Sequence, residues 1–109
     1  MTINEYQKEA MRTAQADTLN NEERLLNGVM GLNGEAIDIV KKHIFQGHDL
    51  DIEHVAKELG DIAWYLATSA DAIGYDLETI LQMNVDKLRA RYPEGFDPDK
   101  SQHRTAGDV

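Results

Sequence analysis

The sequence predicts an all-α fold in which four helices form a bundle. Strand signals are almost absent, because the chain has few alternating β-branched residues and no Asn-Gly or Asp-Gly turn set between such alternations. Apolar residues instead recur at intervals of three and four over long stretches, which is the period of an amphipathic helix. The two prolines, Pro93 and Pro98, come after these stretches. Helices are therefore expected up to about residue 91.

A first helix is expected over about 3–16. Thr2 and Glu5 have the spacing of a capping box, in which each side chain accepts a hydrogen bond from the backbone N–H of the other residue. Tyr6 and Ala10 come after them at helical intervals. The polar residues that come next end this helix.

A second helix is expected from residue 21 or 22 to about Gln46, and Gly47 suits its C-terminal cap because glycine readily adopts a left-handed conformation. Its main apolar stripe is predicted to face the core, and consists of Leu26, Val29, Met30, Ile37, Val40 and Ile44. Gly28, Gly31 and Gly34 form a smooth ridge that lets another helix approach closely. Each glycine lowers the stability of a helix by about 1 kcal/mol, and close packing would offset this loss.

Asp51 is expected to cap a third helix over about 52–73, and a fourth helix covers about 77–91. Their inward positions are Val55, Leu59, Ile62, Leu66 and Ile73 in the third helix and Leu77, Ile80, Leu81, Val85 and Leu88 in the fourth. A polar stretch without regular structure comes last. The chain is therefore predicted to be one all-α domain over residues 1–96 with a loosely attached polar tail over 97–109.

Composition excludes several classes of function. Eleven basic and twenty acidic residues give a net charge of −9, which argues against binding to a nucleic-acid backbone or an anionic membrane. A small phosphorylated ligand stays compatible with this charge, because bound metal ions reverse the local field. There is no cysteine, so neither a disulfide nor a thiolate metal site can form. No segment has the apolar length of a signal peptide or a membrane span, so a soluble cytoplasmic protein is expected.

Additional apolar residues predict assembly into a homodimer or a homotetramer. Leu25, Leu32 and Ile39 lie outside the main stripe of the second helix, and Trp64 projects away from the core stripe of the third helix on a helical wheel. A helix that is apolar on more than one side is usually buried on more than one side. The alternative is that Trp64 folds over its own helix and stays half exposed.

Two acid pairs carry the functional hypothesis. Glu35 and Asp38 lie three apart in the second helix, and Glu58 and Asp61 lie three apart in the third, so each pair shares a helix face. In an antiparallel hairpin Asp38 and Glu58 would each lie roughly 10–12 Å from the turn, and therefore level with each other. Four converging carboxylates repel one another unless a hard divalent cation is bound. The spacing therefore predicts a Mg²⁺ site.

Each acid pair also has an ordinary structural interpretation. Asp38 and Lys42 have the i,i+4 spacing of a surface salt bridge, and Glu58 and Asp61 can form a solvated face beside Lys57. Taken alone, either pair fits this interpretation better than a metal site. Two pairs at the same level of one hairpin strengthen the case for a metal site, but spacing alone leaves both interpretations open.

The ligand types favour particular metals. Ligation by carboxylates alone suits Mg²⁺ or Mn²⁺, whereas a di-iron bundle would show Glu-x-x-His motifs. His43, His48 and His54 cluster near the expected hairpin and offer a softer site. Their spacing matches no zinc pattern, and histidines in loops and at helix ends are commonly just exposed.

The few basic residues are placed close to this chemistry. Lys42 comes after the first acid pair, and Lys87, Arg89 and Arg91 come after Asn84 in the fourth helix. A polyphosphate carries more negative charge than a bound metal ion neutralises, and lysines and arginines beside the metal compensate the remainder. The alternative is that lysines and arginines at helix C-termini complement the helix dipole.

Four segments resemble the MazG-like nucleoside triphosphate pyrophosphohydrolases: GLNGEA, KKHIFQGH, ELGDIAWYLA and NVDKLRARYPEGF. The resemblance extends from Asn4 to about Phe96. It implies an all-α fold that assembles as dimers or dimers of dimers. It also implies Mg²⁺ bound by an E-x-x-E pair and an E-x-x-D pair, and cleavage of a nucleoside triphosphate to a nucleoside monophosphate and pyrophosphate.

The match to this pattern is incomplete in one segment. Glu35 corresponds to the first ligand, and Glu58 and Asp61 correspond to the second pair, but the second glutamate of the first pair is absent. A segment shorter by about three residues rotates the remainder of the helix by about 60° around its axis. Asp38 then falls three residues after Glu35 and can replace the lost glutamate with a shorter reach.

The resemblance and the residues together lead to an expected Mg²⁺-dependent nucleoside triphosphate pyrophosphohydrolase, with Mn²⁺ as the alternative ion. The expected metal ligands are Glu35, Asp38, Glu58 and Asp61. One of the glutamates Glu35 and Glu58 is expected to act in catalysis by accepting the proton of the attacking water. The residues expected to contact the substrate are Lys42, Trp64, Tyr65, Asn84 and Lys87. Because one glutamate is missing, the second hypothesis is a non-catalytic helical oligomerisation or regulatory module with the same fold.

Overall fold

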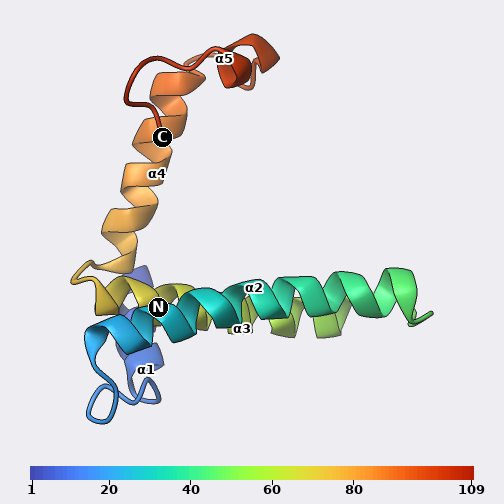
Figure 1. Ribbon diagram of the computed structural model, residues 1–109. Coiled ribbons are helices and arrows are strands. Elements are labelled where there is room, and N and C mark those ends of the chain that lie inside the picture. Colours follow the sequence, from blue (N-terminus) through green and yellow to red (C-terminus); the bar gives the residue numbers. More distant parts are fainter. The chain divides into compact units, whose positions relative to one another are not determined.

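The computed structural model describes residues 1–109, and all its regular elements are helices, which confirms the predicted all-α class. Its helices are α1 (Ile3–Met11), α2 (Asn21–Phe45), α3 (Ile52–Ala72), α4 (Leu77–Arg91) and α5 (Pro98–Gln102) (Figure 1). None of them combines the length and the apolar character that a membrane crossing requires. The chain divides into two compact units, Met1–Leu77 (unit 1) and Glu78–Val109 (unit 2). The predicted packing of four helices into one bundle is not confirmed, because α1, α2 and α3 pack together in unit 1 and most of α4 belongs to unit 2.

Helix α1 begins as expected and ends early. Thr2 Oγ1 accepts from the Glu5 N–H at 3.0 Å, and Glu5 Oε2 accepts from the Thr2 N–H at 3.1 Å, so the capping box is confirmed. The helix stops at Met11 instead of residue 16. Beyond it the chain turns, and Gln15 has a positive φ of 56°, which cannot continue a helix.

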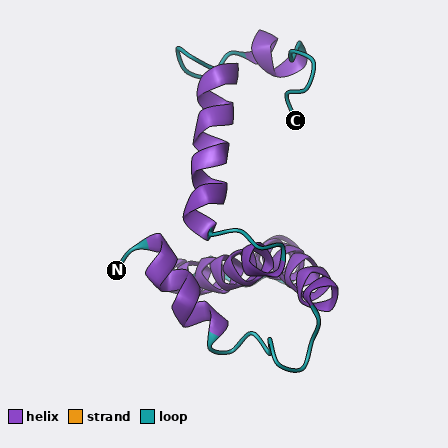
Figure 2. Cartoon of the chain, turned by 90° about the vertical axis from the view of Figure 1, so that its left-hand side faces the viewer, coloured by secondary structure: helices purple, strands orange, loops and turns teal.

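Helices α2 and α3 lie side by side and form the main body of unit 1 (Figures 1 and 2). Two glycines of α2 allow this close approach. A Cβ atom at Gly28 would collide with the Ser69 side chain, and one at Gly31 would collide with the Tyr65 ring. Gly34 faces open space, so the predicted glycine ridge makes contact only at its first two positions. Gly47 ends α2 with φ +69°, as expected.

Helix α1 packs against α3, on one side of the α2–α3 pair in Figure 2. The buried centre consists of Ala10, Ala67 and Leu77, with Tyr6, Trp64 and Leu66 packed around it. The expectation that Trp64 projects away from the core is therefore wrong. Its indole N–H donates to Ala10 O and to Thr13 Oγ1, both at 3.1 Å, at the end of α1. Both the indole ring and its donor are thus used to attach α1.

Gln7 ties α1 to the connection between α3 and α4. This side chain is buried, and its amide donates to Ala67 O at 3.3 Å and to Tyr75 O at 3.0 Å. Its carbonyl accepts from the Leu77 N–H at 2.9 Å. Because all its hydrogen bonds are to backbone groups, Gln7 fixes the path of the chain there.

The prediction of which apolar side of α2 faces the core is wrong. The predicted core stripe is exposed, with Met30 73% and Ile37 65% exposed. Leu25, Leu32 and Ile39, which were expected outside that stripe, are partly buried instead. The reason is that these three residues share their helix face with Gly28, the glycine that contacts α3. The glycines, not the larger apolar residues, mark the inward side of α2.

Residues 97–109 of unit 2 form more regular structure and more contacts than the loosely attached tail that was expected there. Asp97 caps α5, with its side chain accepting from the Asp99 N–H at 3.0 Å, so regular structure continues beyond Gly95. The Arg91 guanidinium donates to both carboxylate oxygens of Asp108, at 2.7 and 2.6 Å. The boundary at residues 96 and 97 stays a prediction.

Candidate metal centre

The structure brings three of the four expected ligands together. Glu35 comes from the middle of α2, and Glu58 and Asp61 come from successive turns of α3. One carboxylate oxygen from each of them lies within 4.8 Å of the others. The close contact of Gly28 and Gly31 with α3 sets this arrangement, since it holds the helix face that carries Glu35 against α3.

Glu58 is the most enclosed member of this acidic cluster. Its side chain is 15% exposed, and its Oε2 atom is buried without any hydrogen-bond partner. Its other oxygen, Oε1, lies 3.5 Å from His54 Nε2. A buried carboxylate oxygen without a partner is costly. The Oε2 atom is therefore suited to a ligand that neutralises it, such as a cation.

The neighbouring carboxylates affect the pKa of Glu35. Its pKa is raised above the ordinary value, mainly because the protonated carboxyl group hydrogen-bonds Glu58. Partial desolvation and the negative charges of Glu58, Asp61 and Asp38 raise the pKa further. Without a cation, the neighbouring carboxylates thus favour the protonated form of Glu35.

Asp38 lies outside this group of three. Its carboxylate pairs with Lys42 Nζ at 2.9 Å, one turn along α2. The pKa of Lys42 is raised mainly by this hydrogen bond and by the charge of Asp38. The charges of Glu58 and Glu35 raise it further. Lys42 therefore stands within electrostatic reach of the acidic cluster. A ligand role for Asp38 stays a prediction.

Two aromatic residues of α3 border the cluster. Glu35, Asp61, Trp64 and Tyr65 line a concavity of about 270 Å³. The two rings meet edge to face, with centroids 5.2 Å apart. Because the Trp64 N–H already bonds α1, only other parts of this side chain are left for a substrate contact. Asn84 and Lys87 belong to unit 2, and their role toward this site stays a prediction.

The histidines near the hairpin do not form a ligand set of their own. His43 Nδ1 lies 3.1 Å from His48 O, and His54 is next to Glu58. These histidines line a separate concavity of about 480 Å³ together with Lys42. The contact between His54 and Glu58 was not expected, although its i,i+4 spacing in α3 could have indicated it.

Comparison with known proteins identifies a related family. The family model of the MazG nucleotide pyrophosphohydrolase domain matches residues 20–96, which include the whole acidic cluster. The chain is also similar to the Gene 37 protein of Mycobacterium phage L5, with 34% identity over 114 residues. That alignment covers 95% of this chain and all of the phage protein. No solved structure matches the chain.

Proposed function

Since the chain belongs to the MazG nucleotide pyrophosphohydrolase domain family, we propose that it hydrolyses a nucleoside triphosphate to a nucleoside monophosphate and pyrophosphate with the help of Mg²⁺. The observation that carries this proposal is the acidic cluster of Glu35, Glu58 and Asp61. Triphosphates carry several negative charges, so a site made of carboxylates can hold one only when cations lie between them.

The donor set fits a hard divalent cation. All three groups offer carboxylate oxygens, which suit Mg²⁺ or Mn²⁺, and one of these oxygens is buried without a partner. Glu35, Glu58 and Asp61 would hold the ion, and Asp38 would join them by leaving Lys42. When bound, such an ion polarises phosphate oxygens and lowers the pKa of a coordinated water.

The residues around the cluster can then orient the substrate. The charges of Glu58 and Glu35 act on Lys42, which makes it a candidate to donate to a phosphate oxygen beside the ion. Tyr65 and Trp64 border a concavity where a base could stack. We propose that Glu35 or Glu58 accepts the proton of the attacking water. Asn84 and Lys87 remain proposed contacts of the phosphates or the sugar.

We also propose that the working form is a homodimer or a homotetramer. Helix α2 exposes a stripe of apolar residues, and part of it forms a concavity lined by Ala36, Ile37, Val40, Lys41 and Phe45. Contiguous apolar surface of this kind is rare on monomers. In a symmetric pair, the same stripe of a second copy would cover it.

The test is the release of pyrophosphate from a panel of nucleoside triphosphates, with and without Mg²⁺, and with chemical identification of both products. Activity is expected only with the metal, and it should be lost in Glu58→Gln. A matched control is Glu53→Gln, which removes an exposed carboxylate of the same helix and should keep the parent rate. Equal loss in both variants would refute the assignment of the cluster.

The second candidate is the non-catalytic helical module. The pairing of Asp38 with Lys42 favours it, because this pair leaves three carboxylates where the family pattern has four. This candidate predicts no pyrophosphate release from any triphosphate, together with an unchanged oligomeric state in Glu58→Gln. The same panel therefore decides between the two.

A further inference from the structure

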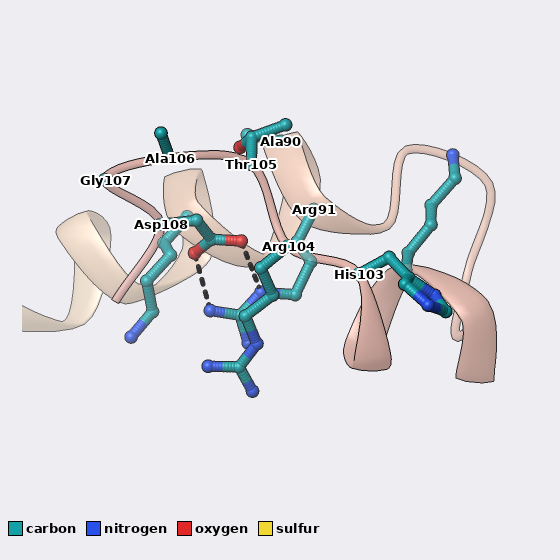
Figure 3. Close-up of a pocket in the computed structure, with 10 residues that line it drawn as sticks. Ala90, Arg91, His103, Arg104, Thr105, Ala106, Gly107 and Asp108 are labelled. Atoms are coloured by element: carbon teal, nitrogen blue, oxygen red, sulfur yellow. Dashed lines mark hydrogen bonds and ion pairs between the residues drawn. The ribbon is translucent and has the colours of Figure 1, made fainter.

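Cations gather around one concavity in unit 2. It measures about 520 Å³, within the range of about 300–1,000 Å³ that is usual for small-molecule sites. The charged and titratable residues that line it are Lys87 and Arg91 of α4, Lys100 of α5, and His103, Arg104 and Asp108 after it (Figure 3). Four lysines and arginines thus surround a single carboxylate, in a protein whose net charge is −9.

The wall of this concavity is held in place by the bidentate pair between Arg91 and Asp108. Both side chains are largely enclosed, at 9% and 13% exposed, and two dashed contacts join them in Figure 3. The Asp108 N–H also donates to Thr105 O at 3.1 Å, which closes a turn at Gly107 with φ +87°. Parallel contacts between a guanidinium and a carboxylate fix geometry as well as charge. The segment over 104–108 is therefore attached to α4.

The charges inside this concavity are not balanced. Asp108 neutralises Arg91, and its pKa is lowered mainly by that hydrogen bond, with contributions from the charges of Arg104 and Lys87. Lys87, Lys100 and Arg104 form no ion pair in the structure. His103 Nδ1 lies 3.0 Å from Asp99 Oδ1, so this imidazole already has a polar partner. Three unpaired cations around one hollow repel one another and attract an anion.

We propose that this concavity binds a multivalent phosphate anion, with Lys87, Lys100 and Arg104 as its contacts. A monovalent anion leaves most of the surplus charge uncompensated, whereas a diphosphate group matches it. Arginine binds phosphate oxygens in a bidentate manner, and lysine adds point charges at the rim. The anion is either inorganic pyrophosphate or the phosphate chain of a nucleotide, which share this chemistry.

The proposed anion site can be tested separately from the acidic cluster, although Lys87 is a proposed contact in both. Lys100 and Arg104 lie beyond residue 96, where the match to the family model ends. The acidic cluster needs a cation before it can accept a phosphate, while the anion site supplies its own positive charge. Binding without any metal therefore separates the two sites, and either can be present without the other.

The test is a calorimetric titration of the full chain with inorganic pyrophosphate in low-salt buffer. Metal is removed beforehand with a chelating resin, because EDTA is itself a multivalent anion. The parent is expected to bind one pyrophosphate per chain. The double variant Lys100→Gln/Arg104→Gln should bind at least about tenfold more weakly. Parallel titrations with a nucleoside monophosphate and a nucleoside triphosphate show which source of phosphate binds best.

Two controls make the result decisive. Arg89→Gln removes a cation of α4 that does not line the concavity, so its affinity should stay within about twofold of the parent. Asp108→Asn removes a negative charge but also the pair that holds the wall, so weaker binding is expected. No binding by the parent, an equal loss in Arg89→Gln, or tighter binding by Asp108→Asn would each overturn the proposed site.

Discussion

Glu58 occupies a position that a carboxylate alone does not favour. Its side chain is largely enclosed, one of its oxygens lacks a partner, and carboxylate oxygens of Glu35 and Asp61 lie within 4.8 Å of it. Such a residue is poorly explained by stability, since replacement of a buried charged group by a neutral one is often neutral or stabilising. Its place agrees with the proposed binding of a cation at the cluster.

We therefore expect Glu58→Gln to be as stable as the parent, or more stable, in metal-free buffer. The amide keeps the shape of the side chain and removes one negative charge from the cluster. Addition of millimolar Mg²⁺ should raise the melting temperature of the parent but not that of the variant, because an ion that binds only the folded state stabilises it. Thermal unfolding monitored by circular dichroism measures both. An equal rise in the two proteins would contradict this prediction.

The lowered pKa of Asp108 leads to a prediction about the stability of residues 104–108 at low pH. The folded pKa is lowered by Arg91, so the pair contributes stability at pH values above the unfolded pKa of about 3.9. This contribution is lost as the pH falls through the lower folded pKa. We expect the amides of residues 104–108 to lose protection from hydrogen exchange in that window. In Asp108→Asn they should be unprotected already at neutral pH, with no further change on acidification.

At the scale of helices, α1 is held by a few specific contacts. It is short, and its attachment depends on Gln7, Trp64 and the small residues between them. Isolated helices of this length are not stable in water, so α1 exists because α3 and the α3–α4 connection receive it.

We predict that Gln7→Ala destabilises the protein by about 2–3 kcal/mol, since it leaves two backbone carbonyls and one N–H in a buried region without their partner. Unfolding in urea gives the difference in free energy. Gln82→Ala is the control, because this exposed glutamine donates a hydrogen bond to the exposed Asp86 side chain, and its effect should stay within about 0.5 kcal/mol. Similar effects of the two changes would mean that Gln7 does not fix α1.

The helices themselves could largely be predicted from the sequence, because caps and periodicity are local signals. Thr2, Asp51 and Gly47 placed helix ends within a few residues. The inward face of α2 could not be predicted in the same way. That helix is apolar on two sides, and its contact with α3 is made at glycines, which apolar periodicity does not detect.

The site was predictable to a similar extent. The spacing of Glu35, Glu58 and Asp61 predicted that they lie close together. In an antiparallel hairpin, residues at similar distances before and after the turn lie side by side. The pairing of Asp38 with Lys42 depends on side-chain geometry, and spacing allowed both outcomes. The contact between Arg91 and Asp108 spans 17 residues across irregular chain, so no local pattern indicates it.

At the scale of the whole molecule, the exposed stripe of α2 supports the proposed assembly of two or more chains. Large apolar residues such as Ile37 and Ile44 remain more than half exposed along one face. A net charge of −9 opposes association, so a pair must bury enough apolar surface to outweigh that repulsion. Assembly should consequently strengthen with added salt, which screens the repulsion.

We predict that light scattering of the parent at micromolar concentration gives at least twice the chain mass of 12.3 kDa. Ile37→Glu should yield a smaller species, because it places a charge in the centre of the stripe. Ala16→Glu introduces the same charge at an exposed position of the loop between α1 and α2, and should assemble like the parent. A parent mass near 12.3 kDa would refute the proposed assembly.

The contact of Gly28 and Gly31 with Ser69 and Tyr65 also determines where this chain tolerates a change in length. It fixes the register of α2 against α3 before the chain reaches Glu35. Residues added or lost after Ala36 therefore leave Glu35 in place and rotate only the later part of α2, by about 100° for each residue. Related chains can differ in length at this point and still keep three carboxylates together, whereas a residue added between Gly31 and Glu35 would turn Glu35 away from Glu58.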